Sequence, residues 1–131
     1  EHVKPRLGED VVYLGEVDHA TKVELLGEAS CLLNPIQWHE PFGMVMIESL
    51  ACGTPVLATR FGSVPEIVDD GVTGFVRDDA DDLVEALGRV EELDRGACRA
   101  AVVDRFSQRR MVRDHLELFR SVTEARHLHA A

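Results

Sequence analysis

Short apolar runs alternate along the chain with segments whose apolar residues recur at helical spacing. The runs are bounded by glycine, proline and polar residues, which is typical of buried strands. They predict strands over residues 11–15, 29–35, 54–59 and 74–77. The other segments predict helices over residues 21–28, 43–51, 95–104 and 108–126, and a further helix that starts within the acidic run 78–82.

Each predicted strand is a continuous apolar run, which is typical of a parallel sheet covered on both faces. We therefore expect one domain with an α/β, Rossmann-like parallel sheet and helices on both faces, the runs at Val11, Cys31 and Val56 lying in the same sheet. Ligands bind beyond the carboxyl ends of the strands in such sheets. Functional residues are thus expected at residues 15–18, 34–42, 59–65 and 78.

Glycine and acidic residues mark the ends of several elements. Gly53 follows the helix predicted over residues 43–51 and is expected to adopt the left-handed conformation that ends helices. Residues 60–74 are rich in Gly, Pro, Asp and Ser, and predict a long loop with at most a helical turn at residues 65–68. The acidic run is interpreted as a helix cap, with Asp81 or Asp82 as the capping residue, and not as a metal site.

The charge and composition of the chain argue against several classes of function. The chain has 131 residues and a formal net charge of −10, which argues against sequence-independent binding to nucleic acid or an anionic membrane surface. No apolar run approaches the roughly 20 residues needed to cross a bilayer, and no leader opens the chain, so we expect a cytoplasmic protein without a transmembrane segment. Three widely spaced cysteines, Cys31, Cys52 and Cys98, favour buried or inert thiols over disulfides or metal ligation.

Residues 34–56 carry the pattern most indicative of chemistry. The first amides and the dipole of the helix predicted from Gly43 form an anion site suited to a diphosphate, and a glycine there would let a ligand approach the backbone. Glu40 precedes this helix and Glu48 lies in its second turn. An unpaired carboxylate at Glu48 among apolar neighbours would be costly, and ribose hydroxyls would satisfy it. Alternatively, both glutamates are solvent-facing helix residues.

The same stretch resembles the signature of the retaining GT-B glycosyltransferases, a family that includes glycogen, sucrose and phosphatidylinositol mannosyl transferases. The mark of that family is two glutamates separated by seven residues, matched here by Glu40 and Glu48 with Pro41-Phe42-Gly43 between them. The similarity continues, in order along the chain, through residues 51–58, 62–68 and 70–75. It extends more loosely to the end of the chain.

The resemblance implies a role for each matched residue. Glu48 would accept hydrogen bonds from the ribose of a nucleotide-diphosphate-sugar donor, and Glu40, the catalytic residue, would face hydroxyls of the donor sugar. Retention would proceed on one face of the sugar, with the departing diphosphate helping to deprotonate the acceptor, so stabilising the leaving group is the main task of the protein. No metal or other cofactor is implied, and His39 is interpreted as a packing or rim residue. Sugar and diphosphate would contact the turn at Phe42, Gly43, Met44 and Val45.

The resemblance covers nearly all of the chain but only about the last third of a typical family member. Residues 1–131 would then be the second part of the C-terminal, nucleotide-sugar-binding domain of a GT-B fold. The acceptor-binding N-terminal domain and the upstream Arg and Lys that bind phosphate in the family are outside this sequence. We expect the isolated chain to bind a nucleotide diphosphate weakly and to transfer no sugar.

Three other functions share features with this sequence. A signalling receiver domain has the same alternating architecture but needs a lysine after its last strand, and the two lysines, Lys4 and Lys22, occur too early. A GT-B sugar-nucleotide epimerase shares the fold and the ligand, although the two-glutamate signature favours transfer. A non-catalytic regulatory or assembly module derived from the same domain is also open on the sequence alone.

Overall fold

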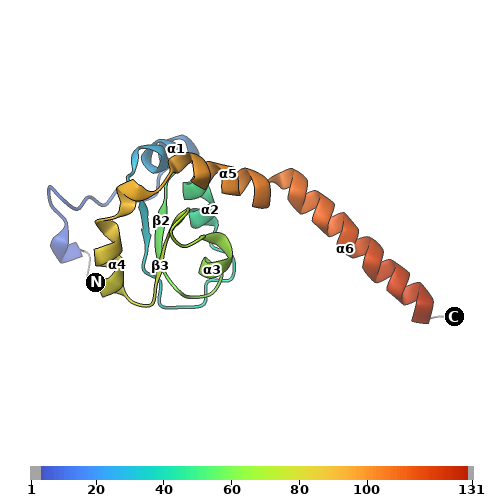
Figure 1. Ribbon diagram of the computed structural model, residues 1–131. Coiled ribbons are helices and arrows are strands. Elements are labelled where there is room, and N and C mark those ends of the chain that lie inside the picture. Colours follow the sequence, from blue (N-terminus) through green and yellow to red (C-terminus); the bar gives the residue numbers. More distant parts are fainter. Residues whose placement is uncertain (1–3, 130–131) are drawn as a thin grey trace.

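The computed structural model describes the backbone of residues 4–129 and the side chains of residues 5–124. It consists of a layered α/β body from which one long helix projects (Figure 1). In chain order, the elements are η1 (Lys4–Arg6), α1 (His19–Glu28), β1 (Leu32–Asn34), α2 (Met44–Ala51), β2 (Val56–Thr59), α3 (Val64–Ile67), β3 (Gly74–Arg77), α4 (Ala80–Leu87), η2 (Val90–Glu92), α5 (Arg95–Arg105) and α6 (Gln108–His129).

The three strands form a parallel sheet in the order β1, β2, β3. Leu32 of β1 lies opposite Val56 of β2, and Thr59 of β2 lies opposite Arg77 of β3. Because the strands are parallel, their carboxyl ends meet at one edge. The predicted parallel sheet is confirmed, and the apolar runs at residues 29–35, 54–59 and 74–77 supply its strands.

The strand predicted over residues 11–15 does not form. These residues have no regular secondary structure, and Val12 and Tyr13 are 68% and 77% exposed. A strand needs a neighbour that pairs with its amides and carbonyls, and within residues 4–129 no strand pairs with this run. The prediction that the runs at Val11, Cys31 and Val56 share a sheet is therefore wrong for the first run, and β3 is the third strand.

Helices cover both faces of the sheet, as predicted (Figure 1). Successive residues of β2 enter different cores, Val56 on one face and Leu57 on the other, which explains why this strand is a continuous apolar run. The core under α2, α3 and α5 includes Met46, Leu50, Val64, Ile67 and Cys98. The core under α4 includes Phe75, Leu83, Ala86 and Leu93.

The acidic run 78–82 begins α4, but the capping residue is not the predicted one. The cap is Asp79, whose side chain accepts a hydrogen bond from the amide of Asp82 at 2.9 Å. A capping carboxylate binds an N–H two or three residues further along, so the first aspartate with extended backbone takes this position. Asp81 and Asp82 lie in the first turn, where the helix dipole also favours negative charge. Gly53 ends α2 with a φ of +78°, as predicted.

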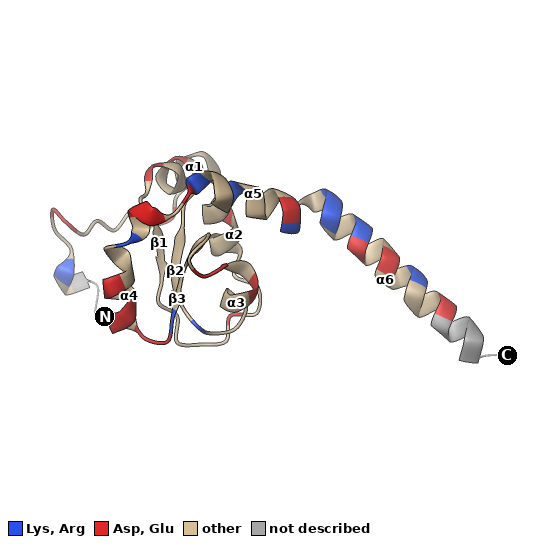
Figure 2. Ribbon diagram, in the orientation of Figure 1, with Lys and Arg blue, Asp and Glu red and all other residues tan. Residues whose placement is uncertain are grey.

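Helix α6 projects away from the body (Figure 1). Figure 2 shows basic and acidic residues interspersed along its described part. Several of its apolar side chains are exposed, including Met111, Leu116, Phe119 and Val122. Across the described residues, no helix combines the length and hydropathy that a membrane span requires.

Gly74 and Gly27 provide a matched test of the register of the sheet. A Cβ at Gly74 in β3 would lie 1.9 Å from the carbonyl oxygen of Val56, whereas a Cβ at Gly27 in α1 would meet no atom within 4 Å. We expect Gly74→Ala to lower the free energy of unfolding by about 2 to 3 kcal/mol, because β2 must shift to make room. Gly27→Ala should raise it by about 0.5 to 1 kcal/mol, since alanine favours a helix. Urea denaturation measures both values, and equal effects would contradict this pairing of β2 with β3.

Candidate functional site

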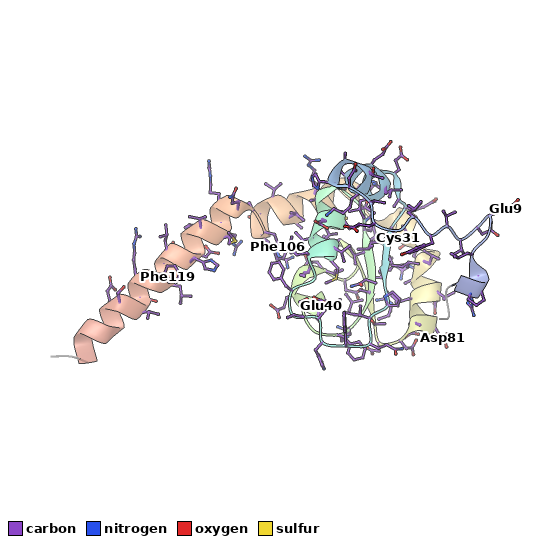
Figure 3. The ribbon with its side chains drawn as sticks, turned by 180° about the vertical axis from the view of Figure 1, so that it is seen from behind. Glu9, Cys31, Glu40, Asp81, Phe106 and Phe119 are labelled. Carbon is purple, nitrogen blue, oxygen red and sulfur yellow. The ribbon has the colours of Figure 1, made fainter. Side chains whose placement is uncertain are left out.

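Residues 35–43 lead from β1 into α2 along the carboxyl edge of the sheet, and Figure 3 shows Glu40 at this edge. The hydroxyl of Thr59, at the end of β2, donates a hydrogen bond to the carbonyl of Ile36. The amide of Ser63, in the loop after β2, donates to the carbonyl of Glu40 at 2.9 Å. The segment that carries Glu40 is therefore held by the end of the neighbouring strand and by the loop that follows it.

Gly62 contacts this segment backbone to backbone. Its φ is +54°, and a Cβ at this position would lie 2.3 Å from the carbonyl oxygen of Glu40 and 2.5 Å from its amide nitrogen. The N–H of Gly62 also donates to Nδ1 of His39 at 3.3 Å. Glycine accommodates both the left-handed backbone and the close approach. Gly62 thus positions the main chain at Glu40.

Helix α2 begins at Gly43, which has a φ of +73° and no side chain with which to cap the first amides. A Cβ there would lie 2.2 Å from Cε of Met46 and 3.2 Å from Oγ of Ser63. The missing Cβ makes room for these side chains, a packing role that the sequence analysis did not predict. Close approach of a ligand to this backbone stays a prediction. The dipole of α2 and the amides of its first turn still give this end a positive potential.

Glu40 is half-buried beside the amino end of α2. Its Oε1 accepts a long hydrogen bond from the amide of Gly43, with 3.4 Å between the two atoms. The carboxylate therefore lies close to the positive end of the helix. The side chains that follow Glu40 are exposed, so this turn borders solvent; they are Phe42, Met44 and Val45.

Glu48, in the second turn of α2, forms an ion pair with Lys22 of α1. Nζ of Lys22 lies 2.6 Å from Oε1 of Glu48, and the two side chains are 35% and 31% exposed. The carboxylate thus has a partner within the chain, which the sequence analysis did not predict, and its binding to ribose stays a prediction. Lys22 is the functional candidate that the sequence analysis missed. It is the one Lys or Arg within α1, but the packing of α1 on α2 decides which residue it meets.

His39 and the three cysteines have packing roles and no evident role in binding or catalysis. The ring of His39 packs edge-on against Phe61, with 5.8 Å between ring centroids, in agreement with a packing role at the rim. Cys98 is buried, Cys31 and Cys52 are half-buried, and all three are free thiols. Burial raises the pKa of the Cys31 and Cys98 thiols, which makes them less reactive, as predicted.

Two further observations bear on where a ligand would bind. In residues 5–124, no group of three or more His, Cys, Asp or Glu side chains is arranged to hold a metal ion. A cavity of about 630 Å³ lies where α5 meets the projecting α6, and Arg110 and Arg113 in its wall pair with Asp114. This cavity contains none of the predicted site residues, so the carboxyl edge near Glu40 is the candidate site.

The sequence model of the family described as Glycosyl transferases group 1 matches residues 4–125. The chain belongs to this family. The match includes both glutamates, the turn between them and most of α6.

Two relatives match most of the length of the chain. A Klebsiella pneumoniae protein described as an uncharacterized 41.2 kDa protein in the cps region is 33% identical over 119 residues, which are 86% of this chain and 33% of the relative. N-acetyl-alpha-D-glucosaminyl L-malate synthase of Bacillus anthracis is 29% identical over 129 residues, which are 92% of this chain and 32% of the relative. The chain thus spans about a third of the length of these relatives.

A third relative and a solved structure agree with this assignment. D-inositol 3-phosphate glycosyltransferase of Saccharomonospora viridis is 41% identical over 96 residues, covering 66% of this chain and 22% of the relative. Sucrose-phosphate synthase from Thermosynechococcus elongatus matches the structure with a TM-score of 0.76 and 29% identity, covering 95% of this chain and 33% of the synthase. The α/β, Rossmann-like fold is therefore that of the GT-B glycosyltransferases.

In this member of the family, two buried serines provide a test of the packing around the site. Oγ of Ser49 donates to the carbonyl of Thr54 at 3.0 Å, whereas Oγ of Ser63, beside Gly43, has no partner in the described part of the chain. Ser49→Ala should lower the free energy of unfolding by about 1 kcal/mol, the usual net value of a hydrogen bond. Ser63→Ala should leave that free energy unchanged or raise it, because an unpaired buried hydroxyl is costly. Chemical denaturation compares the two, and an equal loss would mean that Ser63 is hydrogen-bonded.

Proposed function

We propose that this chain forms the donor-binding part of a retaining glycosyltransferase that moves a hexosyl group from a nucleotide-diphosphate sugar to an acceptor hydroxyl. The observation that carries the proposal is the amino end of α2, where the carboxylate of Glu40 meets amides that lack a side-chain cap. This end lies at the carboxyl edge of a parallel sheet, the usual location of ligands in such folds. Membership of the glycosyl transferase family supports sugar transfer as the general activity.

The diphosphate would bind at the amino end of α2. The amides of Met44 and Val45 belong to an exposed first turn, and the helix dipole adds positive potential there. Negative charge grows on the diphosphate as its bond to the sugar breaks, so fixed amides stabilise the transition state more than the ground state. The departing diphosphate would help to deprotonate an acceptor on the same face of the sugar, which retains the anomeric configuration. In this scheme the amides and the dipole supply the positive potential, and we propose no metal cofactor.

Glu40 would bind hydroxyls of the donor sugar. Its bond to the amide of Gly43 spans 3.4 Å, beyond the usual range for an N–H···O hydrogen bond, so it is weak. A donor could therefore replace this contact at little cost. The carboxylate would then accept a sugar hydroxyl, and the Gly43 amide would donate to an oxygen of the donor.

The acceptor would bind elsewhere in the protein. Relatives named N-acetyl-alpha-D-glucosaminyl L-malate synthase and D-inositol 3-phosphate glycosyltransferase support a transfer reaction, and the chain spans about a third or less of each. Holding donor and acceptor in reacting geometry is a large part of catalysis. The 131-residue chain alone would leave the acceptor unplaced, so we expect it to bind a nucleotide diphosphate weakly and to transfer no sugar.

Glu48 would accept hydrogen bonds from the ribose of the donor, and it is the first residue through which to test this proposal in the full-length protein. Glu48→Gln should weaken donor binding by about 1.5 to 3 kcal/mol, the range for hydrogen bonds to charged groups. The donor KM would then rise by roughly ten- to a hundredfold, while kcat changes little. Initial rates measured with UDP-, ADP- and GDP-linked sugars provide the comparison. An unchanged donor KM would mean that Glu48 does not bind the donor.

Glu40→Gln should have a different effect, because the proposed partner of Glu40 is the sugar. We expect kcat to fall by about a hundredfold, comparable to the loss of one transition-state hydrogen bond, with the affinity for nucleoside diphosphates unchanged. Glu66→Gln is the control, since it alters an exposed carboxylate on α3. Rates and calorimetric affinities are measured for both variants. A loss limited to nucleotide affinity would contradict this role, and interconversion of sugar nucleotides without an acceptor would favour the epimerase alternative.

A further inference from the structure

Several polar contacts attach helix α1 to the rest of the protein. None of its residues is fully buried. At its carboxyl end, the guanidinium of Arg95 donates to the carbonyls of Ala29 at 2.8 Å and Gly27 at 2.7 Å. Closer to its amino end, the side-chain contact with α2 is the ion pair between Lys22 and Glu48. This ion pair therefore connects α1 directly to a residue that we assign to donor binding.

The ion pair occupies one oxygen of the carboxylate. Nζ of Lys22 binds Oε1 of Glu48, and in the described part of the chain Oε2 accepts no hydrogen bond. An ionised carboxylate can accept several hydrogen bonds, so Glu48 keeps the capacity to bind a second group. The ammonium also compensates the charge of a carboxylate that is only 31% exposed. Lys22 thus limits how the carboxylate can rotate without saturating it.

The backbone that carries Lys22 is itself fixed. Asp18 caps α1 by accepting a hydrogen bond from the amide of Thr21 at 2.8 Å. The amide of Lys22 donates to the carbonyl of Asp18 at 2.9 Å, which closes the first helical turn. The ammonium therefore extends from an ordered first turn and not from a loop.

From this geometry we infer that Lys22 is a positioning residue for the ribose of the donor. It orients the carboxylate of Glu48 so that Oε2 accepts a hydrogen bond from a ribose hydroxyl, and it acts through Glu48 without contacting the nucleotide. A carboxylate already held in place loses less side-chain entropy when it binds a ligand. The inference rests on the proposed function, in which Glu48 binds the ribose.

The positioning role of Lys22 can be isolated by measuring how strongly the protein prefers a ribonucleotide to its dideoxy form. In the full-length protein, the affinities of ADP, GDP and UDP are measured by calorimetry, and the tightest of them is compared with its 2′,3′-dideoxy form. We expect the wild type to prefer the ribonucleotide by about tenfold or more, the usual effect of a hydrogen bond to a charged group. Glu48→Gln and Lys22→Met should each remove most of this preference. The double variant should lose no more than Glu48→Gln alone, because both changes act on one contact.

Arg95→Met is the matched control for a general loosening of α1. It removes the hydrogen bonds from Arg95 to the carboxyl end of the helix. It keeps the bond from the Thr54 hydroxyl to the carbonyl of Leu26 and the ion pair between Lys22 and Glu48. We expect it to lower the stability of the protein and to keep the preference for ribose. If Arg95→Met removes that preference as fully as Lys22→Met does, Lys22 is only a structural tether and the inference is wrong.

The outcomes for Glu48 and Lys22 separate the inference from the function on which it rests. If Glu48→Gln retains the ribose preference, the proposed role of Glu48 in donor binding fails. If Glu48→Gln removes the preference but Lys22→Met keeps it, the donor site stands and the inference about Lys22 is overturned. The positioning role of Lys22 is supported if both single variants lose the preference for ribose and the double variant loses no more than Glu48→Gln alone.

Discussion

The close approach of Gly62 to Glu40 is the contact on which the geometry of the candidate site depends. The loops after β1 and β2 leave the same edge of the sheet because the two strands are parallel neighbours. With no Cβ at Gly62, these loops meet main chain to main chain, and the amide of Ser63 can then bond the carbonyl of Glu40. The same approach brings Ser63 against Gly43, where α2 begins. The start of α2 and the carboxylate beside it therefore both depend on this close approach of the two loops.

The two glutamates of the family signature are supported in different ways. Glu40 is positioned by main-chain contacts from a neighbouring loop, which leave little freedom once the sheet has formed. Glu48 lies within a regular helix, and its side chain is positioned by a single ion pair with another helix. A precise site needs such support around the residues that touch the ligand. Changes in α1 would therefore affect Glu48 while leaving Glu40 in place.

Features set by residues close together in the sequence were predictable, whereas features that depend on contacts between distant segments were not. The strand at residues 56–59 was predictable because burial on both faces leaves a continuous apolar run. The run at residues 11–15 has similar composition, but a strand forms only beside a partner, and the pattern contains no information about partners. The cap at Asp79 was missed by two or three residues, because several aspartates close together could each have capped α4.

The candidate site shows the same difference between local features and contacts that join distant parts of the sequence. The turn at Glu40 and the helix after it follow from local sequence, and Gly43 was recognised, although its missing Cβ serves packing against Met46. The pairing of Lys22 with Glu48 was not predictable, since the residues are 26 positions apart and meet through the packing of two helices.

The weak attachment of α1 has a consequence for the dynamics of the protein. A helix that buries no side chain fully and is held by a few polar contacts belongs to the part of a structure with the lowest local stability. An opening of α1 that left the sheet folded would release the ammonium from Glu48. Occupation of Glu48 by a nucleotide would favour the closed arrangement, so the amide hydrogens of α1 would exchange more slowly with solvent. A helix outside the binding turn would in this way report whether the site is filled.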